Sequence, residues 1–256
     1  MTRPPEEKNF DTTLVLSGCK PGACFVDRYR IETLLGSGAM GKVFRATDTV
    51  EDRPVALKVL HPHMAGKAHV AERFGREAEI LRELGHPGIV RIYGAGRAAD
   101  GMDYLVMELL EGRTLGDRLK NGGPMSPVEL LPLLVQVCDA LGAAHVQGVV
   151  HRDLKPDNVF LSHGDGQVKI VDFGLSRMST EKRITKTGMM LGTPRYMPPE
   201  QIRSAKDADA RTDQYALGVI VHEALTGSSP FPADDAGQLL GCVMEGRILR
   251  LEEQVH

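Results

Sequence analysis

The chain has 256 residues, of which 42% are apolar and 25% are charged, and its 31 basic and 34 acidic side chains give a formal net charge of −3. This composition is typical of a soluble globular protein and argues against disorder over most of the length. The near-neutral charge gives no electrostatic reason to expect DNA, RNA or an anionic membrane as the main partner, so we expect no nucleic acid.

The first ten residues, MTRPPEEKNF, lack the apolar core of a secretory signal, and the chain contains no run of 18 apolar residues. We therefore expect a cytoplasmic protein and no membrane span in this chain. The four cysteines are too scattered for a disulfide framework. Cys19 and Cys24 are close enough to form half of a metal site, but without a second pair at suitable spacing a flexible tail is favoured.

The first half of the chain predicts a small α+β unit. Residues 1–28 are expected to be a flexible N-terminal tail, because Pro, Gly, Lys and Glu dominate there without a hydrophobic period. Strand-like runs follow at 29–38, 41–48 and 53–60, and two more lie within 88–98 and 102–110. Between them, Phe74, Ala78, Leu81 and Leu84 share one helical face. An antiparallel sheet carrying one helix is therefore expected over 29–108.

From residue 109 onward the pattern becomes mainly helical. The sequence SPVE at 126–129 is a capping box, and it predicts a helix to about residue 148, with a kink or a later start at Pro132. A second helix is expected over 213–225, capped by Thr212 and ended by Gly227, and a third near 235–246. The loop-rich segment 151–211 is long enough to predict a function there.

A glycine motif, GSGAMG at 36–41, separates the first two predicted strands. With 28 glycines in 256 residues, this G-x-G-x-x-G spacing arises by chance about once in three such chains. A dinucleotide-binding fold requires the glycines to open a helix, whereas VFRA at 43–46 continues as a strand. The remaining interpretations are a turn whose backbone N–H groups cover phosphates and an ordinary hairpin turn.

Lys58 alternates with Val55, Leu57 and Val59 in the third strand, which predicts an inward-facing ammonium group. An unpaired buried ammonium is costly, so this lysine requires an anion. Glu77 on the following helix is the favoured partner, with Glu79 and Glu83 as rivals. The ordinary alternative is a lysine and a glutamate that both lie on the surface.

The strongest motif is HRDLKPDN at 151–158, which is followed by DFG at 172–174, GTPRYM at 192–197 and PPE at 198–200. It places an acid, a base and an amide in one loop and a second acid on a neighbouring turn. Together with the glycine turn and Lys58, these motifs resemble the eukaryotic-like serine/threonine protein kinases found in bacteria. The resemblance spans residues 29–247. It implies an α+β bilobal protein-kinase fold, with an N-lobe at 29–108 and a mainly helical C-lobe at 109–256.

The resemblance also implies the activity and its residues. ATP and Mg²⁺ are the implied cofactors, and serine and threonine hydroxyls of proteins are the implied substrates. Lys58, paired with Glu77, is expected to hold the α- and β-phosphates. Asp153 is the implied base, and Lys155 is expected to neutralise the transferring phosphate.

Asn158 and Asp172 are the implied Mg²⁺ ligands, because both offer hard oxygen atoms. The adenine is expected against 107–110, although an ordinary edge strand that runs into a linker is the alternative for this segment. The residues expected to bind the nucleotide and its metal are Gly36, Ser37, Gly38, Ala39, Gly41, Val43, Ala56, Lys58, Met107, Glu108, Leu110, Asn158 and Asp172. An apolar column of Leu81, Ile92, Phe173 and His151 that stands on Asp213 is also implied.

Thr185 and Thr187 stand where the family carries autophosphorylated threonines. Arg152, next to the implied base, is placed to pair with a phosphothreonine and to order that loop. We predict that both threonines are phosphorylated.

The chain departs from the family in its C-terminal part. Family members carry further helices there, including an arginine that pairs with the carboxylate of Glu200, whereas this sequence stops at His256. We therefore expect an incomplete C-lobe that belongs to a longer protein or is covered by a partner or a second copy in a homodimer. The alternative function is a truncated or pseudokinase-like scaffold that binds nucleotide without turnover, and a small-molecule kinase is a weaker third interpretation.

Overall fold

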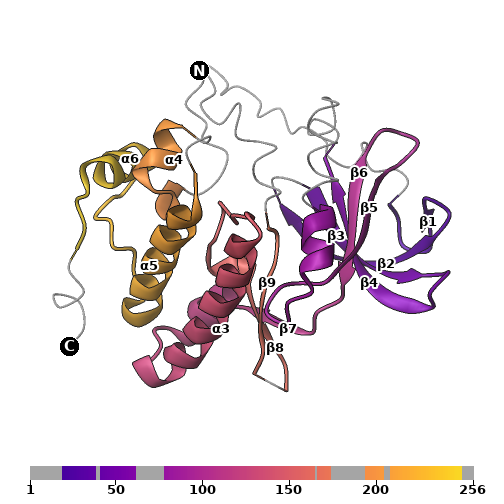
Figure 1. The fold of residues 1–256 in the computed structure, drawn as a ribbon, viewed down its shortest axis with the longest axis horizontal. Helices are drawn as coiled ribbons and strands as arrows, with labels where there is room; N and C mark the ends of the chain where they lie inside the picture. The colour runs from indigo at the N-terminus through magenta and orange to yellow at the C-terminus, as the bar shows by residue number, and fades with distance from the viewer. Residues whose placement is uncertain are drawn as a thin grey trace, which may run out of the picture.

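The computed structural model describes residues 19–38, 41–61, 78–164, 166–173, 194–204 and 208–249, which form a sheet-rich N-lobe and a mainly helical C-lobe (Figure 1). This arrangement confirms the predicted α+β class. The N-lobe sheet is antiparallel and has the strand order β1-β2-β3-β4-β6-β5. Its strands are β1 (Cys24–Phe25), β2 (Tyr29–Gly38), β3 (Gly41–Asp48), β4 (Arg53–Leu60), β5 (Ile92–Arg97) and β6 (Asp103–Glu108).

Strand β4 lies in the middle of this sheet and is covered on both faces. Val55, Leu57 and Val59 are fully buried in a cluster on one face, as their alternation predicts. Ala56 and Leu60 face the other side, where they join a core that continues into the C-lobe. Lys58 shares the parity of Ala56 and Leu60. The strand period therefore directs its ammonium group toward the C-lobe.

The N-terminal tail is shorter than the sequence predicts, because residues 19–28 belong to the N-lobe. Strand β1 pairs with β2 through Cys24↔Arg30 and Phe25↔Tyr29. Cys19 and Phe25 are buried in the same cluster as Val55. Few side chains in residues 19–28 are buried, so this segment shows no hydrophobic period. The sequence pattern therefore could not predict that it joins the N-lobe. Residues 1–18 lie outside the described part of the chain.

The C-lobe combines helices with a small antiparallel sheet of order β7-β8-β9, and α3 lies alongside α5 (Figure 1). Within the described residues, the C-lobe contains the 3₁₀ turns η2 (Pro156–Asn158) and η5 (Pro194–Tyr196). The strands are β7 (Gly112–Thr114), β8 (Val159–Ser162) and β9 (Val168–Ile170). The helices are α2 (Leu115–Gly122), α3 (Pro127–Val146), α4 (Pro199–Arg203), α5 (Ala210–Thr226) and α6 (Ala236–Glu245).

Helix ends test the capping predictions. Helix α3 begins with the predicted capping box, in which Ser126 and Glu129 each accept the other's backbone N–H, and it continues through Pro132, so a later start is wrong. Helix α6 starts after the cap Asp235, near the predicted position. Helix α5 starts earlier than predicted, because Asp209 caps it by accepting the N–H of Arg211. Asp209 and Thr212 are both good caps, and the sequence pattern did not separate them.

Helix α3 also reaches the length and hydropathy of a membrane span, with a mean hydropathy of 1.4 over 18 residues. In the structure it serves as a core helix of the C-lobe. Leu130, Val137, Ala140 and Ala144 are nearly fully buried. Only one face of the helix is packed in this core, because 28% of the apolar window is buried and Val128, Leu131, Val135 and Val146 are exposed. Length and composition alone are weak evidence for a membrane span.

Cys19 provides a test of the N-terminal correction. Burial, together with the negative charge of Asp100, raises the pKa of the Cys19 thiol to about 11. The reactive thiolate is therefore scarce at pH 8. We expect iodoacetamide at pH 8 to modify the exposed Cys24 and Cys138 rapidly and Cys19 only after unfolding, as read by peptide mass spectrometry. Protein labelled in urea is the control, and equal rates for Cys19 and Cys24 in the native protein would contradict the packing of residues 19–28.

Candidate active site

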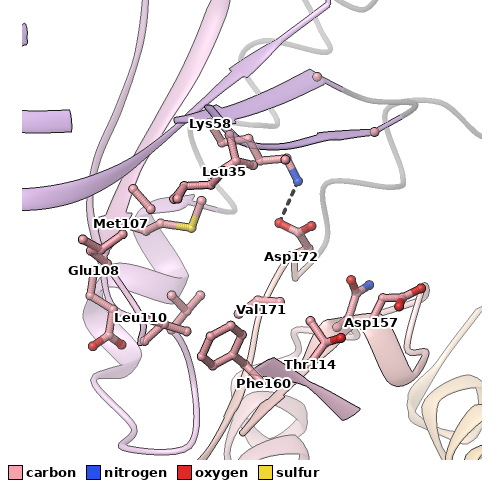
Figure 2. A pocket seen from close by; sticks show the side chains of 18 of the residues that line it. Leu35, Lys58, Met107, Glu108, Leu110, Thr114, Asp157, Phe160, Val171 and Asp172 are labelled. Atoms are coloured by element: carbon pink, nitrogen blue, oxygen red, sulfur yellow. Dashed lines mark hydrogen bonds and ion pairs between the residues drawn. The ribbon is translucent and has the colours of Figure 1, made fainter. Parts of the chain in front are cut away.

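A cleft of about 560 Å³ lies between the lobes and is lined by residues from both of them (Figure 2). The glycine turn, β4 and residues 107–110 contribute from the N-lobe side, and residues 153–158 and 171–172 contribute from the C-lobe side. The sequence-predicted residues that line it are Gly36, Ser37, Gly38, Gly41, Val43, Ala56, Lys58, Met107, Glu108, Leu110, Asp153, Lys155, Asn158 and Asp172. Ala39, Glu77, Thr185 and Thr187 lie outside the described residues.

Packing requires a glycine at Gly41 but not at Gly36 or Gly38. Strands β2 and β3 pair as far as Gly38↔Gly41, so the motif is a hairpin turn between strands, as its context predicts. A Cβ atom at Gly41 would overlap the carbonyl oxygen of Val59, so this glycine permits the contact between β3 and β4. A Cβ atom at Gly36 or Gly38 would meet no atom within 4 Å. These two positions therefore leave open space above the cleft.

Lys58 reaches from the N-lobe to the C-lobe. Its side chain is only 6% exposed, and its Nζ lies 2.6 Å from Oδ1 of Asp172 (Figure 2). The rival partner Glu79 instead pairs with Arg82 on the surface. The ammonium therefore has the anion that its burial demands, supplied by the predicted metal ligand.

The pKa of Asp172 is set by two opposing effects. Burial disfavours its ionised form, but the charge and hydrogen bond of Lys58 outweigh burial and hold the pKa below its usual value. The backbone of Asp172 also has a φ of 63°, in the left-handed region that favours glycine. Strain of this kind persists where the surrounding structure imposes it, and it is common at functional sites.

The loop that carries Asp153 is organised by the carboxylate of Asp213. This side chain has no exposed surface, and it accepts the backbone N–H groups of His151 and Arg152 at 2.8 Å each. Nε2 of His145 lies 2.7 Å from the same carboxylate. Arg152 has a φ of 65°, so the loop turns sharply where both amides converge on one acceptor. The turn directs the next residue, Asp153, into the cleft.

Further hydrogen bonds fix the groups around Asp153. Nζ of Lys155 lies 3.0 Å from its carboxylate, and Nδ2 of Asn158 donates to its backbone oxygen at 2.8 Å. His151 Nδ1 accepts the N–H of Asp153 at 3.3 Å, while its Nε2 lies 2.9 Å from the carbonyl oxygen of Val171. Since a carbonyl only accepts, these two bonds require an imidazole with its proton on Nε2.

An apolar column supports this loop, as the resemblance implies. The rings of His151 and Phe173 are 4.7 Å apart. Phe173 lines a small cavity together with Leu81 and Ile92 of the N-lobe. The column therefore packs the two lobes together directly behind Asp172.

Mg²⁺ fits the donor set only in the presence of a ligand that brings further oxygens. Within the described residues no cluster of three or more His, Cys, Asp or Glu side chains is present. Asn158 uses its amide nitrogen on Asp153, so its amide oxygen is the atom that suits a metal, together with the carboxylate of Asp172. Mg²⁺ typically takes one or two protein oxygens, with phosphates and water completing its octahedron. The cleft therefore suits Mg²⁺ that arrives with a polyphosphate.

The sequence analysis missed the apolar walls of the cleft. Leu35, Val90, Leu109, Phe160 and Val171 line it together with Thr114 and Asp157. Most of these residues directly precede or follow a motif residue. Their position next to a motif residue was thus the only sequence signal that they line the cleft. Which of their side chains point into the cleft could be learned only from the fold.

Comparisons with known proteins agree with this geometry. The family model described as protein kinase domain matches residues 29–254. Serine/threonine-protein kinase PknL of Mycobacterium tuberculosis is 44% identical over 210 residues, which cover 82% of this chain and 52% of that protein. Serine/threonine-protein kinase pkn2 of Myxococcus xanthus is 43% identical over 209 residues, which cover 80% of this chain and 25% of that protein.

Solved structures show the same arrangement. The PknI kinase domain of Mycobacterium tuberculosis matches with a TM-score of 0.68 and 30% identity, over 82% of this chain and 79% of that one. Rad53 1–466 in complex with AMP-PNP matches with a TM-score of 0.70 and 29% identity, over 87% of this chain and 54% of that one. The chain spans about half or less of the length of the curated relatives named above.

The depressed pKa of Asp172 predicts a pH-dependent effect of Lys58→Met. A carboxylate with a lowered folded-state pKa stabilises the fold above its unfolded pKa of about 3.9 and loses that contribution as pH falls through the folded-state value. Without Lys58 the depression disappears. We expect the wild type to lose stability relative to Lys58→Met as pH falls from 7 to 3, measured by urea denaturation.

Lys42→Met, which removes a lysine from the neighbouring strand β3, is the control for this experiment. Its stability difference from the wild type should stay constant over the same pH range. A pH-independent difference for Lys58→Met would contradict the coupling between Lys58 and Asp172.

Proposed function

Because the chain belongs to the protein kinase family, we propose that it transfers the γ-phosphate of ATP to serine and threonine hydroxyls of proteins. One observation carries this proposal. Lys58, Asp153, Asn158 and Asp172, which come from three separate segments, line a single cleft beneath the glycine turn. Phosphoryl transfer depends mainly on positioning and on charge neutralisation, and these four groups supply both.

The substrate side of the cleft supplies the acceptor chemistry. Asp153 accepts a hydrogen bond from the incoming hydroxyl and orients its oxygen toward the terminal phosphorus. Lys155, whose Nζ lies 3.0 Å from the Asp153 carboxylate, places a positive charge where the transferred phosphoryl group accumulates negative charge. A lysine two residues after the base is the family feature that favours serine and threonine over tyrosine as acceptor.

The nucleotide side requires an exchange of partners. Lys58 and Asp172 neutralise each other at 2.6 Å in the ligand-free cleft. Asp172 and Asn158 would hold Mg²⁺ through their side-chain oxygens, the metal would supply neutralisation of phosphate charge, and Lys58 would then hold the α- and β-phosphates. The direct pair keeps the buried ammonium satisfied until the ligand arrives.

Residues 107–110 and the apolar wall suit the adenine. Met107 is buried, and it lines the cleft together with Val43, Ala56 and Phe160. The backbone groups of Glu108 and Leu110 are the proposed hydrogen-bond partners of the adenine.

We place the protein in the cytoplasm, in keeping with its free cysteines.

Asp153→Asn tests the enzyme against the nucleotide-binding scaffold. The substitution keeps the size of the side chain but removes the base, so kcat for transfer from labelled ATP to a basic test protein should fall about 10²- to 10⁴-fold. The affinity for Mg-ATP, measured by calorimetry, should change little. Asp52→Asn, on an exposed turn of the N-lobe, is the matched control and should keep wild-type activity. If the wild type and Asp153→Asn both bind Mg-ATP and neither transfers phosphate, the scaffold function is correct.

Thr185 and Thr187 test the proposed autophosphorylation. We expect the double variant Thr185→Ala/Thr187→Ala to lose most loop phosphate after incubation with Mg-ATP, as read from intact-protein mass spectra. Thr180→Ala, in the same segment, serves as the control and should retain it. Unchanged phosphate incorporation in the double variant would rule out these two sites.

A further inference from the structure

A second contact between the lobes lies behind the cleft. Nζ of Lys169, on β9 of the C-lobe, is 2.7 Å from Oε1 of Glu108, the last residue of β6 in the N-lobe sheet. The two side chains are only 16% and 20% exposed. Ion pairs in such partly buried positions are screened less by salt than surface pairs are.

Backbone hydrogen bonds join the same two strands to residues 88–91. Val90 donates its N–H to Ile170 O at 3.0 Å, and Ile170 donates to Gly88 O at 2.8 Å. One residue further on, Arg91 N donates to Oε1 of Glu108 at 2.8 Å, and Glu108 N donates to Arg91 O at 2.9 Å. Oε1 of Glu108 therefore accepts from both Arg91 and Lys169. We call Glu108, Lys169 and residues 88–91 the hinge clasp.

The hinge clasp rests on a rigid base. Ile89, Val90 and Ile170 are buried in the core shared by the lobes. A Cβ atom at Gly88 would lie 2.9 Å from Cβ of Ala140, so residues 88–91 pack closely on α3. Nearby, Nε2 of His86 lies 3.2 Å from the carboxylate of Asp139 on α3. Residues 88–91 are thus fixed to the C-lobe, and Glu108 is the group that the clasp holds against them.

Glu108 also belongs to the nucleotide-binding segment. Its side chain points away from the Lys58–Asp172 pair (Figure 2), and residues 107–110 line the cleft. Lys169 precedes Asp172 by three residues on the same strand and turn. The clasp therefore links the segment that contacts the adenine to the segment that carries the metal ligand.

From this geometry we propose that Lys169 is a positioning residue, which fixes residues 107–110 relative to Asp172 through the carboxylate of Glu108 and so prepares the cleft for ATP. The inference rests on the proposed kinase function. Without Lys169, the Glu108 side chain keeps the amide of Arg91 as its partner among the described residues, and the 107–110 segment gains conformational freedom that ATP binding must remove. Such a loss of preorganisation weakens binding more than it slows a step at saturation.

Lys169→Met tests this role, because it keeps the length of the side chain and removes its charge. The KM for ATP should rise about three- to tenfold while kcat at saturating ATP stays within about twofold, and Lys169→Arg should restore the KM. Hydrogen exchange at the amides of Val90 and Ile170, measured without nucleotide, should become faster. Arg247→Met removes the cation of an exposed pair with Glu245 and is the matched control.

The two readouts separate the outcomes. Unchanged exchange in Lys169→Met overturns the clasp, and this holds even if the wild type transfers no phosphate, because the exchange measurement needs no activity. Faster exchange with an unchanged KM for ATP reduces the pair to a structural role and also overturns the proposal. Loss of transfer in the wild type would instead refute the kinase function.

Discussion

The geometry of the cleft depends on the buried carboxylate of Asp213. A carboxylate without exposed surface is stable only when donors surround it. Here the donors are the backbone amides of His151 and Arg152 and the side chain of His145. Because two consecutive amides must point at one acceptor, the backbone turns through the left-handed conformation at Arg152. That turn sets the positions of Asp153, Lys155 and Asn158, which follow it in the chain.

Among the described residues, the ion pairs Lys58–Asp172 and Lys169–Glu108 both join the lobes, and they differ in their surroundings. Lys58 and Asp172 pair inside the cleft, where both groups have a second use, so their contact can open when phosphates and a metal replace it. Lys169 and Glu108 pair behind the cleft, where Arg91 holds the same carboxylate. The front pair keeps two buried charges satisfied in the ligand-free cleft, whereas the rear pair joins Glu108 at the end of β6 to β9. The apolar column of Phe173 and its neighbours lies close to both pairs and keeps the lobes in contact.

Local sequence patterns predicted much of the fold and most of the site. Strand-like runs on either side of the glycine turn located β2 and β3, the alternation of Val55, Leu57 and Val59 located β4, and the capping box located the start of α3. Residues 19–28 escaped because a short strand with few burying residues has no period of its own. The start of α5 was misplaced because Asp209 and Thr212 offer equivalent caps, and only the tertiary fold, which buries Thr212, decides between them. The contact of Lys58 with Asp172 was not predicted, since Asp172 lies 114 residues away, and the predicted partner Glu77 lies outside the described residues.

This division has a physical origin. Groups that carry out chemistry must act within a few ångströms of one another, so a short loop such as 151–158 can hold several of them and leave a readable motif. Groups that position this loop must be anchored elsewhere in the fold. Asp213 lies 62 residues from His151, and Lys169 lies 61 residues from Glu108. Their sequence neighbours give no sign of the contact, because a lone Asp or Lys is ordinary in any helix or strand. The family resemblance named Asp213 but not its hydrogen bonds to the loop, and nothing in the sequence pointed to Lys169. The contacts that position the loop and residues 107–110 therefore had to come from the packed structure.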